Sequence, residues 1–354
     1  MTQDIDEAWL AQVEEPALDP EAPVVDPHHH LWSRPFLYQT AELLADLTDG
    51  HRVVATVYTE AGRGYRTEGP AHLRPVGETE LITATAEASD RAGNAPRICA
   101  GITGAGDLTA GEGKVEELLE AHVAAGKGRF SGVRANIFLT FDSAAATMVP
   151  LAGWEAAVDR PDFQAGVGVL GRKGLALDLV AVHHHLPHVA RLAGRFPGTT
   201  MVVNHLAPFA DFAGNTAEAE LMAAWRRGIE ALAPHANVHM KLGGLANPFM
   251  GHSLPAFRTL RERPKPPTSE ALAALYRPMV SHAIETLGPG RCMFESNFPV
   301  DRRCLSYRVL WNAFKRLARP YSDDERHALL MGTAVRAYKL KGVAHPADTT
   351  GRTP

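Results

Sequence analysis

The sequence predicts an α/β protein with a (β/α)8 TIM barrel, regular or distorted, and three observations support this fold. The chain has 354 residues, of which 45% are hydrophobic, so it is long enough for one large domain. Eight short segments rich in apolar and β-branched residues are spread along it. Longer helical patterns lie between these segments. Eight strands with helical crossovers favour a barrel over an open doubly wound sheet.

The eight strand candidates follow one another at spacings that leave room for helices. They are VVDPHHHLW at 24–32, RVVATVYTE at 52–60, RICAGIT at 97–103, FSGVRANI at 130–137, LALDLVAV at 175–182, TTMVVNHL at 199–206, NVHMKLGGL at 237–245 and RCMFESNF at 291–298. Helical patterns between them include GETELITATAEASDRAG, KVEELLEAHVAAG and LPHVARLAGRF. We place the barrel domain at 24–341, after an N-terminal arm or short peripheral helix at 1–23 and before a flexible tail at 342–354.

The charge and cysteine content of the chain indicate which kinds of molecule it binds. The formal net charge is -4 with both signs scattered, which offers no long-range attraction for nucleic acid or an anionic membrane. Three widely spaced cysteines predict no disulfide framework, and we expect a cytoplasmic protein without an export or membrane segment. A small-molecule substrate is therefore the expected partner, and the sequence leaves open a homo-oligomer.

The strongest motif lies at the end of the first strand candidate, where His28 and His30 stand two residues apart. Residues i and i+2 of a strand face the same way, so both imidazoles can point into one pocket, with His29 facing outward. Imidazole is a common metal ligand and moves protons near neutral pH. The flanking apolar residues argue against a solvated histidine run.

Other strand candidates also end in chemically capable residues. Catalytic groups of a barrel sit at the C-terminal ends of its strands, where the βα loops gather. The residues at or near such ends are Glu60, Arg134, His183, His205, Lys241, Glu295 and Asn297. Each has a structural explanation by itself, but together they predict an active site.

With these motifs in order, the chain resembles the amidohydrolase superfamily. Within it, the chain is most similar to the amidohydrolase-related group that includes fuconolactonases, pyrone dicarboxylate lactonase and sulfomuconolactone hydrolase. The resemblance spans most of 24–340. Its carriers are DPHHHLW at 26–32, GVRANI at 132–137, the run DLVAVHHHLPHVARLAGRFPGTTMVVNHLA at 178–207, MKLGGL at 240–245, FESNFPVD at 294–301 and GTAVRAYKL at 332–340.

The resemblance implies roles for four histidines around the reacting carbonyl. In metal-using relatives the first-strand pair, a fifth-strand His and an eighth-strand Asp hold one divalent ion. On this chain His28, His30 and His183 would hold zinc or manganese, and His205 would assist acid-base chemistry. Several lactonases of the group work without a tightly held metal, so a metal-free site is the alternative.

The chain departs from the family pattern at the eighth strand. Relatives commonly read Ser-Asp-x-Pro, whereas this chain has Asn297 between Ser296 and Phe298. An amide can neither take a proton from water nor balance the charge of a metal. Glu295 shares a strand face with Asn297, one layer deeper, and is a candidate base or ligand as well as a candidate structural ion pair. The predicted catalytic residues are thus His183, His205, Glu295 and Asn297.

Cationic and aromatic residues near the strand ends are candidates for substrate binding. Arg134 and Lys241 suit a substrate carboxylate, because cations in a barrel mouth commonly pair with anions. Pairing with a neighbouring Asp or Glu is the structural alternative for both. Trp32, Tyr58 and Asp301 complete the predicted substrate-binding set, and the two aromatic residues have core packing as their alternative.

Three functions follow from these residues. The leading one is a hydrolase that opens a carboxylate-bearing lactone with activated water. The second is a metal-dependent decarboxylase or hydratase of an aromatic or unsaturated acid, as in other members of the superfamily. The third is a protein that retains only ligand binding because it lacks the eighth-strand Asp.

Overall fold

The computed structural model describes residues 5–343, apart from 35, 94, 143–146, 212–215, 247–256 and 258–259. Eight strands within these ranges form one sheet, in the order β1-β2-β3-β4-β7-β8-β9-β10, and each neighbouring pair is parallel. They are β1 (Val24–His29), β2 (Val53–Thr59), β3 (Arg97–Ala105), β4 (Phe130–Ala135), β7 (Ala176–Leu179), β8 (Met201–Val203), β9 (Val238–Leu242) and β10 (Cys292–Phe294). Every strand candidate from the sequence overlaps one of them, and β3 extends two residues past its candidate at 97–103. The predicted TIM-barrel fold is confirmed.

The sheet curls until β1 lies beside the segment that follows β10, and this contact nearly closes the barrel. The backbone N–H of His30 donates to Phe298 O at 2.8 Å, and that of Asn297 donates to His28 O at 3.0 Å. These hydrogen bonds join the ends of the first and last strands, which are far apart in sequence. Closure therefore brings the paired histidines next to the residues after β10.

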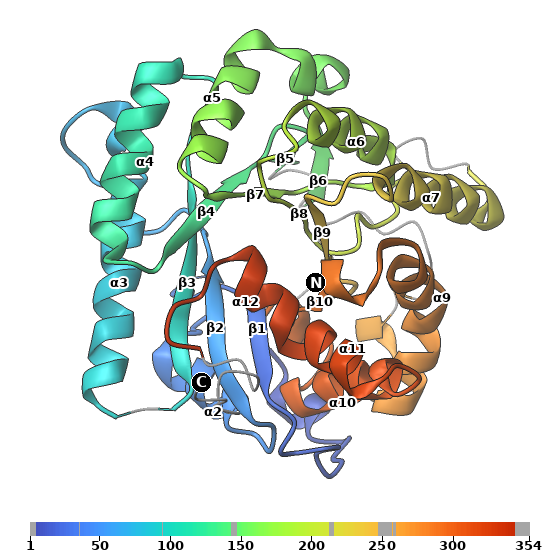
Figure 1. Ribbon diagram of the computed structural model, residues 1–354. Coiled ribbons are helices and arrows are strands. Elements are labelled where there is room, and N and C mark those ends of the chain that lie inside the picture. The colour runs from blue at the N-terminus through green and yellow to red at the C-terminus, as the bar shows by residue number, and fades with distance from the viewer. Residues whose placement is uncertain are drawn as a thin grey trace, which may run out of the picture.

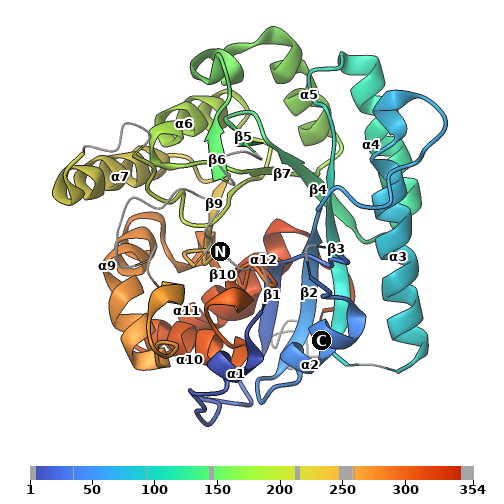
Figure 2. The ribbon, with the colours of Figure 1, turned by 180° about the vertical axis from the view of Figure 1, so that it is seen from behind.

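Helices cover the outside of the sheet, and Figures 1 and 2 show α3, α4 and α5 flanking it on one side. Their apolar faces pack on the outward side chains of the strands. The helices are α1 (Glu7–Leu10), α2 (Thr40–Leu47), α3 (Val76–Arg91), α4 (Glu112–Gly126), α5 (Pro161–Arg172), α6 (Leu186–Arg195), α7 (Glu218–Leu232), α9 (Ser269–Leu287), α10 (Tyr307–Ala318), α11 (Asp323–His327) and α12 (Thr333–Ala337). A short antiparallel hairpin of β5 (Leu139–Asp142) and β6 (Thr147–Pro150) follows β4. The sequence analysis did not predict this hairpin.

The C-terminal segment lies across the end of the barrel opposite the predicted site, and α12 appears there in Figure 1. Met331, Ala334 and Leu340 pack in one cluster with Val25 and Ala55, which lie near the starts of their strands. A Cβ on Gly101 of β3 would lie 2.7 Å from Leu340 Cδ2. A side chain at this position would force the end of the Leu340 side chain to shift. The C-terminal segment therefore closes the end of the barrel at which the strands begin.

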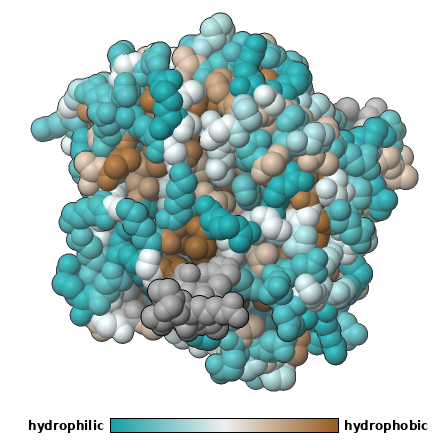
Figure 3. Space-filling view, viewed as in Figure 1, coloured by the Kyte–Doolittle hydropathy of each residue, from teal (hydrophilic) through white to brown (hydrophobic). Residues whose placement is uncertain are grey.

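The residues before β1 pack on the last helices of the barrel. The Trp9 indole N–H donates to Arg263 O at 3.1 Å, and the Leu18 N–H donates to the side chain of Asn312 in α10 at 2.7 Å. Most of the tail expected at 342–354 lies outside the described residues. No helix in the described part of the chain is long and apolar enough to cross a membrane. The face drawn in Figure 3 is mostly hydrophilic.

Candidate functional site

A cavity of about 710 Å³ lies at the C-terminal ends of the strands. Its walls come from segments that follow β1, β2, β8 and β10, from the end of β4 and from the β5–β6 hairpin. Because parallel strands end at the same side of a barrel, residues far apart in sequence meet here. The predicted site residues that line the cavity are His30, Trp32, Arg134, His205 and Asn297.

A buried carboxylate joins two histidines at the base of this cavity. Glu295 Oε1 lies 2.7 Å from Nδ1 of His205, and Glu295 Oε2 lies 2.8 Å from Nδ1 of His28. The backbone N–H of His205 also donates to Glu295 Oε1, at 3.0 Å. All three side chains are buried, Glu295 completely. The glutamate therefore orients both imidazoles, and the Nδ1–H of His205 donates to it while Nε2 stays available for chemistry.

His28, His205 and Glu295 could bind a divalent metal, because one ligand atom from each lies within 4.8 Å of the others. His28 and His30 offer a different pair of donor atoms, Nε2 of each ring. Nε2 of His28 lies 3.3 Å from Nε2 of His30, close to the distance of roughly 3.4 Å between two nitrogens on one tetrahedral zinc. Nδ1 of His30 donates to Thr59 O at 2.8 Å, which leaves Nε2 of His30 as an acceptor or ligand.

The backbone around His205 and β9 is shaped to admit these side chains. His205, Leu206 and Ala207 all have positive φ, from 44° to 59°, a conformation that is strained for residues with side chains and is frequent at functional sites. A Cβ on Gly244 would lie 2.1 Å from Nδ1 of His205, and one on Gly243 would lie 2.2 Å from the backbone oxygen of Glu295. The two glycines after β9 are therefore needed for His205 and Glu295 to meet.

We expect Gly243→Ala to lower the stability by about 1 to 3 kcal/mol and to reduce activity, because the new methyl group displaces the Glu295 backbone. The free energy of unfolding in urea measures the first effect. Gly113→Ala is the matched control: a Cβ there meets nothing within 4 Å, so helix α4 should gain stability or stay unchanged. Equal unfolding free energies for the two variants would contradict this role of Gly243.

Lys241 lies under the histidines and does not line the cavity, which corrects its predicted role in substrate binding. Its Nζ lies 2.8 Å from Asp178 Oδ2 and 3.2 Å from Nδ1 of His28, and the lysine is fully buried. Tyr338, which follows α12, donates its hydroxyl to Asp178 at 2.9 Å. The structural alternative, a pair with a neighbouring Asp, is the one observed. Lys241 supports His28 from below.

Asp301 also lies behind the cavity wall. It accepts hydrogen bonds from Nδ2 of Asn297 at 2.9 Å and from the Ala246 N–H at 3.2 Å, and it is fully buried. Burial raises the pKa of its carboxyl well above the usual range. Its predicted contact with substrate is corrected, because the side chain holds Asn297 instead. With Nδ2 tied to Asp301, the amide oxygen of Asn297 is the atom left to face the cavity.

Tyr58 is placed on the outer side of β2, where its hydroxyl donates to Glu78 of α3 at 2.7 Å. Its predicted role in the pocket is corrected. Core packing, the alternative given for this aromatic residue, is the arrangement observed, because its side chain is fully buried.

His183 begins a 3-10 turn, His183–His185, beyond the end of β7. Its Nδ1 accepts a hydrogen bond from the Ala210 N–H at 3.3 Å, and its ring lies against His184 and Phe209. Within the described residues, the group of ligand atoms that could hold a metal does not include it. The structure therefore brings His28 together with His205 and Glu295 rather than with His183.

Arg134 is fixed at the wall of the cavity by Glu60. Its Nε donates to Glu60 Oε1 and its Nη2 donates to Glu60 O, both at 2.7 Å. Arg34 and Arg63, which were not predicted as site residues, line the same cavity. Three arginines and one carboxylate, that of Glu60, line the cavity, so its lining carries an excess of positive charge.

Trp32 also lines the cavity and stacks on His30, with ring centroids 5.7 Å apart.

The sequence analysis did not predict two further residues of the site, Asp178 and Tyr338. Asp178 is a charged residue inside the otherwise apolar strand β7 (ALDL), and that position was a usable signal. Tyr338 had no such signal, because it belongs to the end of the chain and reaches Asp178 only in the folded barrel.

Burial keeps His28 and His30 neutral near pH 7. It lowers the pKa of His28 and of His30 well below 6.5, and the nearby charges of Lys241 and Arg134 act in the same direction. Neutral imidazoles are the forms that accept protons or ligate a metal.

Histidines away from the cavity make stability depend on pH. Burial lowers the pKa of His51, His122 and His239 from 6.5 to about 4, so the unfolded chain binds more protons between these values. Asp26 acts oppositely: burial raises its pKa from 3.8 to about 6, so its contribution is lost as pH rises. Asp46, Glu78 and Asp301 act like Asp26, because burial also raises the pKa of their carboxyls. The histidines with a lowered pKa still outnumber these four carboxyls, since His28, His29, His30, His183 and His185 shift in the same direction. We expect the urea midpoint to fall from pH 7 to pH 4.5, and to fall less in His239→Gln. A midpoint that rises toward pH 4.5 would contradict this.

Comparisons with known proteins identify the family of this chain. A family model described as Amidohydrolase matches residues 25–340. The chain belongs to the amidohydrolase family. This amidohydrolase is 29% identical to the uncharacterized protein y4mH of Sinorhizobium fredii over 338 residues, which cover 90% of this chain and 98% of that protein. The resemblance predicted from the sequence motifs is confirmed.

Two further proteins are similar to parts or all of this chain. L-fucono-1,5-lactonase of Burkholderia multivorans is 31% identical over 200 residues, which cover 54% of this amidohydrolase and 60% of the lactonase. The structure of an amidohydrolase from Burkholderia multivorans with bound zinc matches with a TM-score of 0.66 at 24% identity, covering 90% of this chain and 100% of that one. At that identity the structural likeness shows the shared fold.

Proposed function

We propose that this amidohydrolase hydrolyses a lactone that carries a carboxylate. The observation that carries the proposal is the buried Glu295, which holds the ring of His205 at the base of a cavity lined by three arginines. The partial similarity to a fuconolactonase supports a cyclic ester as the substrate. The partner is therefore a small molecule, and a homo-oligomer stays a prediction.

His205 is the proton carrier in this proposal. Its Nδ1–H donates to Glu295, so Nε2 faces the cavity as a base. A water beside Nε2 loses its proton to the imidazole as it attacks the carbonyl carbon. The imidazolium, stabilised by Glu295, then gives that proton to the departing ring oxygen. This Glu–His pair supplies the base that Asn297 cannot.

The remaining residues bind and orient. The amide oxygen of Asn297 accepts a hydrogen bond from the attacking water, because its nitrogen is tied to Asp301. The guanidinium of Arg134 pairs with the substrate carboxylate. A divalent ion held by His28 and His30 through Nε2 would polarise the carbonyl as a Lewis acid and lower the pKa of bound water. That ion would be zinc or manganese, and the bound zinc of the related structure supports zinc.

A panel of lactones tests the proposal, with carboxylate-bearing and uncharged rings of equal size and acid release as the readout. We expect turnover of the carboxylate-bearing lactones. Arg134→Lys should raise their KM about tenfold or more, since a charged two-pronged contact is lost, and should not raise the KM of uncharged lactones. Arg172→Lys, at an exposed helix end, is the control. Release of carbon dioxide from unsaturated acids without lactone hydrolysis would favour the decarboxylase instead, and binding without turnover would favour a binding protein.

A further inference from the structure

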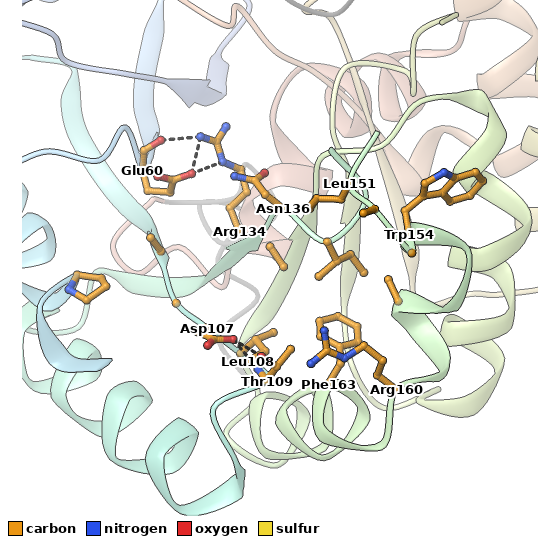
Figure 4. Close-up of a pocket in the computed structure, with 18 of the residues that line it drawn as sticks. Glu60, Asp107, Leu108, Thr109, Arg134, Asn136, Leu151, Trp154, Arg160 and Phe163 are labelled. Atoms are coloured by element: carbon orange, nitrogen blue, oxygen red, sulfur yellow. Dashed lines mark hydrogen bonds and ion pairs between the residues drawn. The ribbon is translucent and has the colours of Figure 1, made fainter. Parts of the chain in front are cut away.

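A second cavity, of about 470 Å³, lies beside the first at the ends of β3 and β4. Figure 4 shows its walls, which include the residues after β3, the loop after β6 and the start of α5. Glu60, Arg134, Asn136 and Leu151 line both cavities. The two spaces are therefore neighbours that share one wall.

Arg134 forms the fixed part of that wall. Its guanidinium is held by the side chain and the backbone oxygen of Glu60, and only 13% of its side chain is exposed. A ligand that pairs with Arg134 in the first cavity can therefore continue past it into the second. Arg134 would then contact the middle of an extended substrate rather than its end.

The second cavity combines apolar walls with a balanced set of charges. Leu108 and Phe163 are almost fully buried in its walls, and Trp154 lies on the side of the β6 loop (Figure 4). Its charged lining residues are Asp107, Arg160, Glu60 and Arg134, two of each sign. This lining gives no net attraction for a second ion.

Asp107 gives the second cavity a polar acceptor. Its Oδ1 accepts hydrogen bonds from the backbone N–H and the hydroxyl of Thr109, at 2.8 and 2.6 Å. Figure 4 marks the contact between these two residues with dashed lines. These two hydrogen bonds hold the Asp107 carboxylate in place through Oδ1. The other oxygen, Oδ2 of Asp107, can accept a hydrogen bond from a hydroxyl of a ligand. An uncharged group with an apolar face and a hydroxyl matches this lining.

We propose that the second cavity binds the uncharged, hydroxyl-bearing end of an extended substrate. The carboxylate of the same substrate lies at Arg134 and its lactone lies at His205. This inference rests on the proposed lactone hydrolysis and adds the shape of the substrate to it.

The test compares two lactones that share one carboxylate-bearing ring, of which one carries an added hydroxyalkyl chain. We expect the native protein to show a KM about tenfold lower for the longer lactone, since a hydrogen bond to a carboxylate and apolar contacts are gained. Ala152→Trp fills the second cavity from an exposed position and should bring the KM ratio close to one. Ala156→Trp is the matched control, because Ala156 is exposed in the same segment without lining the cavity, and it should keep the native ratio.

Equal KM values for the two lactones in the native protein would overturn the inference, and so would equal ratios in the two tryptophan variants. If neither lactone is hydrolysed, the proposed function fails rather than the second cavity. Calorimetry with the two corresponding open-chain hydroxy acids then decides. Tighter binding of the longer acid, lost in Ala152→Trp and kept in Ala156→Trp, supports the second cavity, and equal binding rejects it.

Discussion

We expect Glu295→Gln to lower kcat/KM by about 100 to 1,000-fold, because general-base catalysis contributes an effect of this order. The carboxylate accepts from His205 at Nδ1 and lies against Nδ1 of His28, and it is completely buried. A glutamine has nearly the same shape. It places either a neutral oxygen or an N–H against these rings, so it neither stabilises an imidazolium nor enforces the tautomer with Nε2 free. The readout is kcat/KM on the best lactone of the panel.

Glu78→Gln is the matched control for this variant. Glu78 is also a buried glutamate, but it accepts from the Tyr58 hydroxyl and the Ala61 N–H between β2 and α3 and does not itself line the cavity. It should retain kcat/KM within about threefold. Comparable rates for Glu295→Gln and the native protein would show that another group activates the water. A loss in both variants would point to folding rather than catalysis, which the circular dichroism of each variant checks.

Lys241→Met should destabilise the fold by about 3 to 5 kcal/mol, since it leaves Asp178 as an uncompensated charge in the barrel interior. Both side chains are fully buried and their charged atoms lie 2.8 Å apart. The hydrogen bonds from Asn204 and Tyr338 remain, but neither carries a positive charge. Urea unfolding followed by tryptophan fluorescence measures the change. Such a loss is a large share of the usual 5 to 15 kcal/mol of a domain.

A double variant separates the charge from the packing. Lys241→Met combined with Asp178→Asn removes both charges, so it should recover part of the lost free energy of unfolding. Lys173→Met breaks surface ion pairs with Glu116 and Glu120 and should cost less than about 1 kcal/mol. The burial argument would be wrong if Lys241→Met and Lys173→Met cost the same, or if the double variant recovered nothing.

The site residues differ in how far they could be predicted from the sequence. His28 and His30 were found from spacing alone, because alternation in a strand is a local property. His205, Glu295 and Asn297 were found because strand ends of a barrel converge. Tyr58 was misplaced because an aromatic side chain near a strand end suits core packing as well as a pocket wall, and the sequence does not distinguish the two. Lys241 was misplaced because its partner, Asp178, belongs to a different strand.

By itself, the sequence determined the eight strands, their order and the end of the barrel at which polar residues gather. Apolar periodicity and strand-end position are properties of neighbouring residues, so they are visible without a structure. Only the tertiary structure decided that Glu295 joins His28 to His205, that Asp301 holds Asn297, and that Tyr338 reaches Asp178. These contacts depend on distances of a few ångströms between side chains from different strands and helices. Such distances are set by barrel closure and packing, which no local pattern specifies.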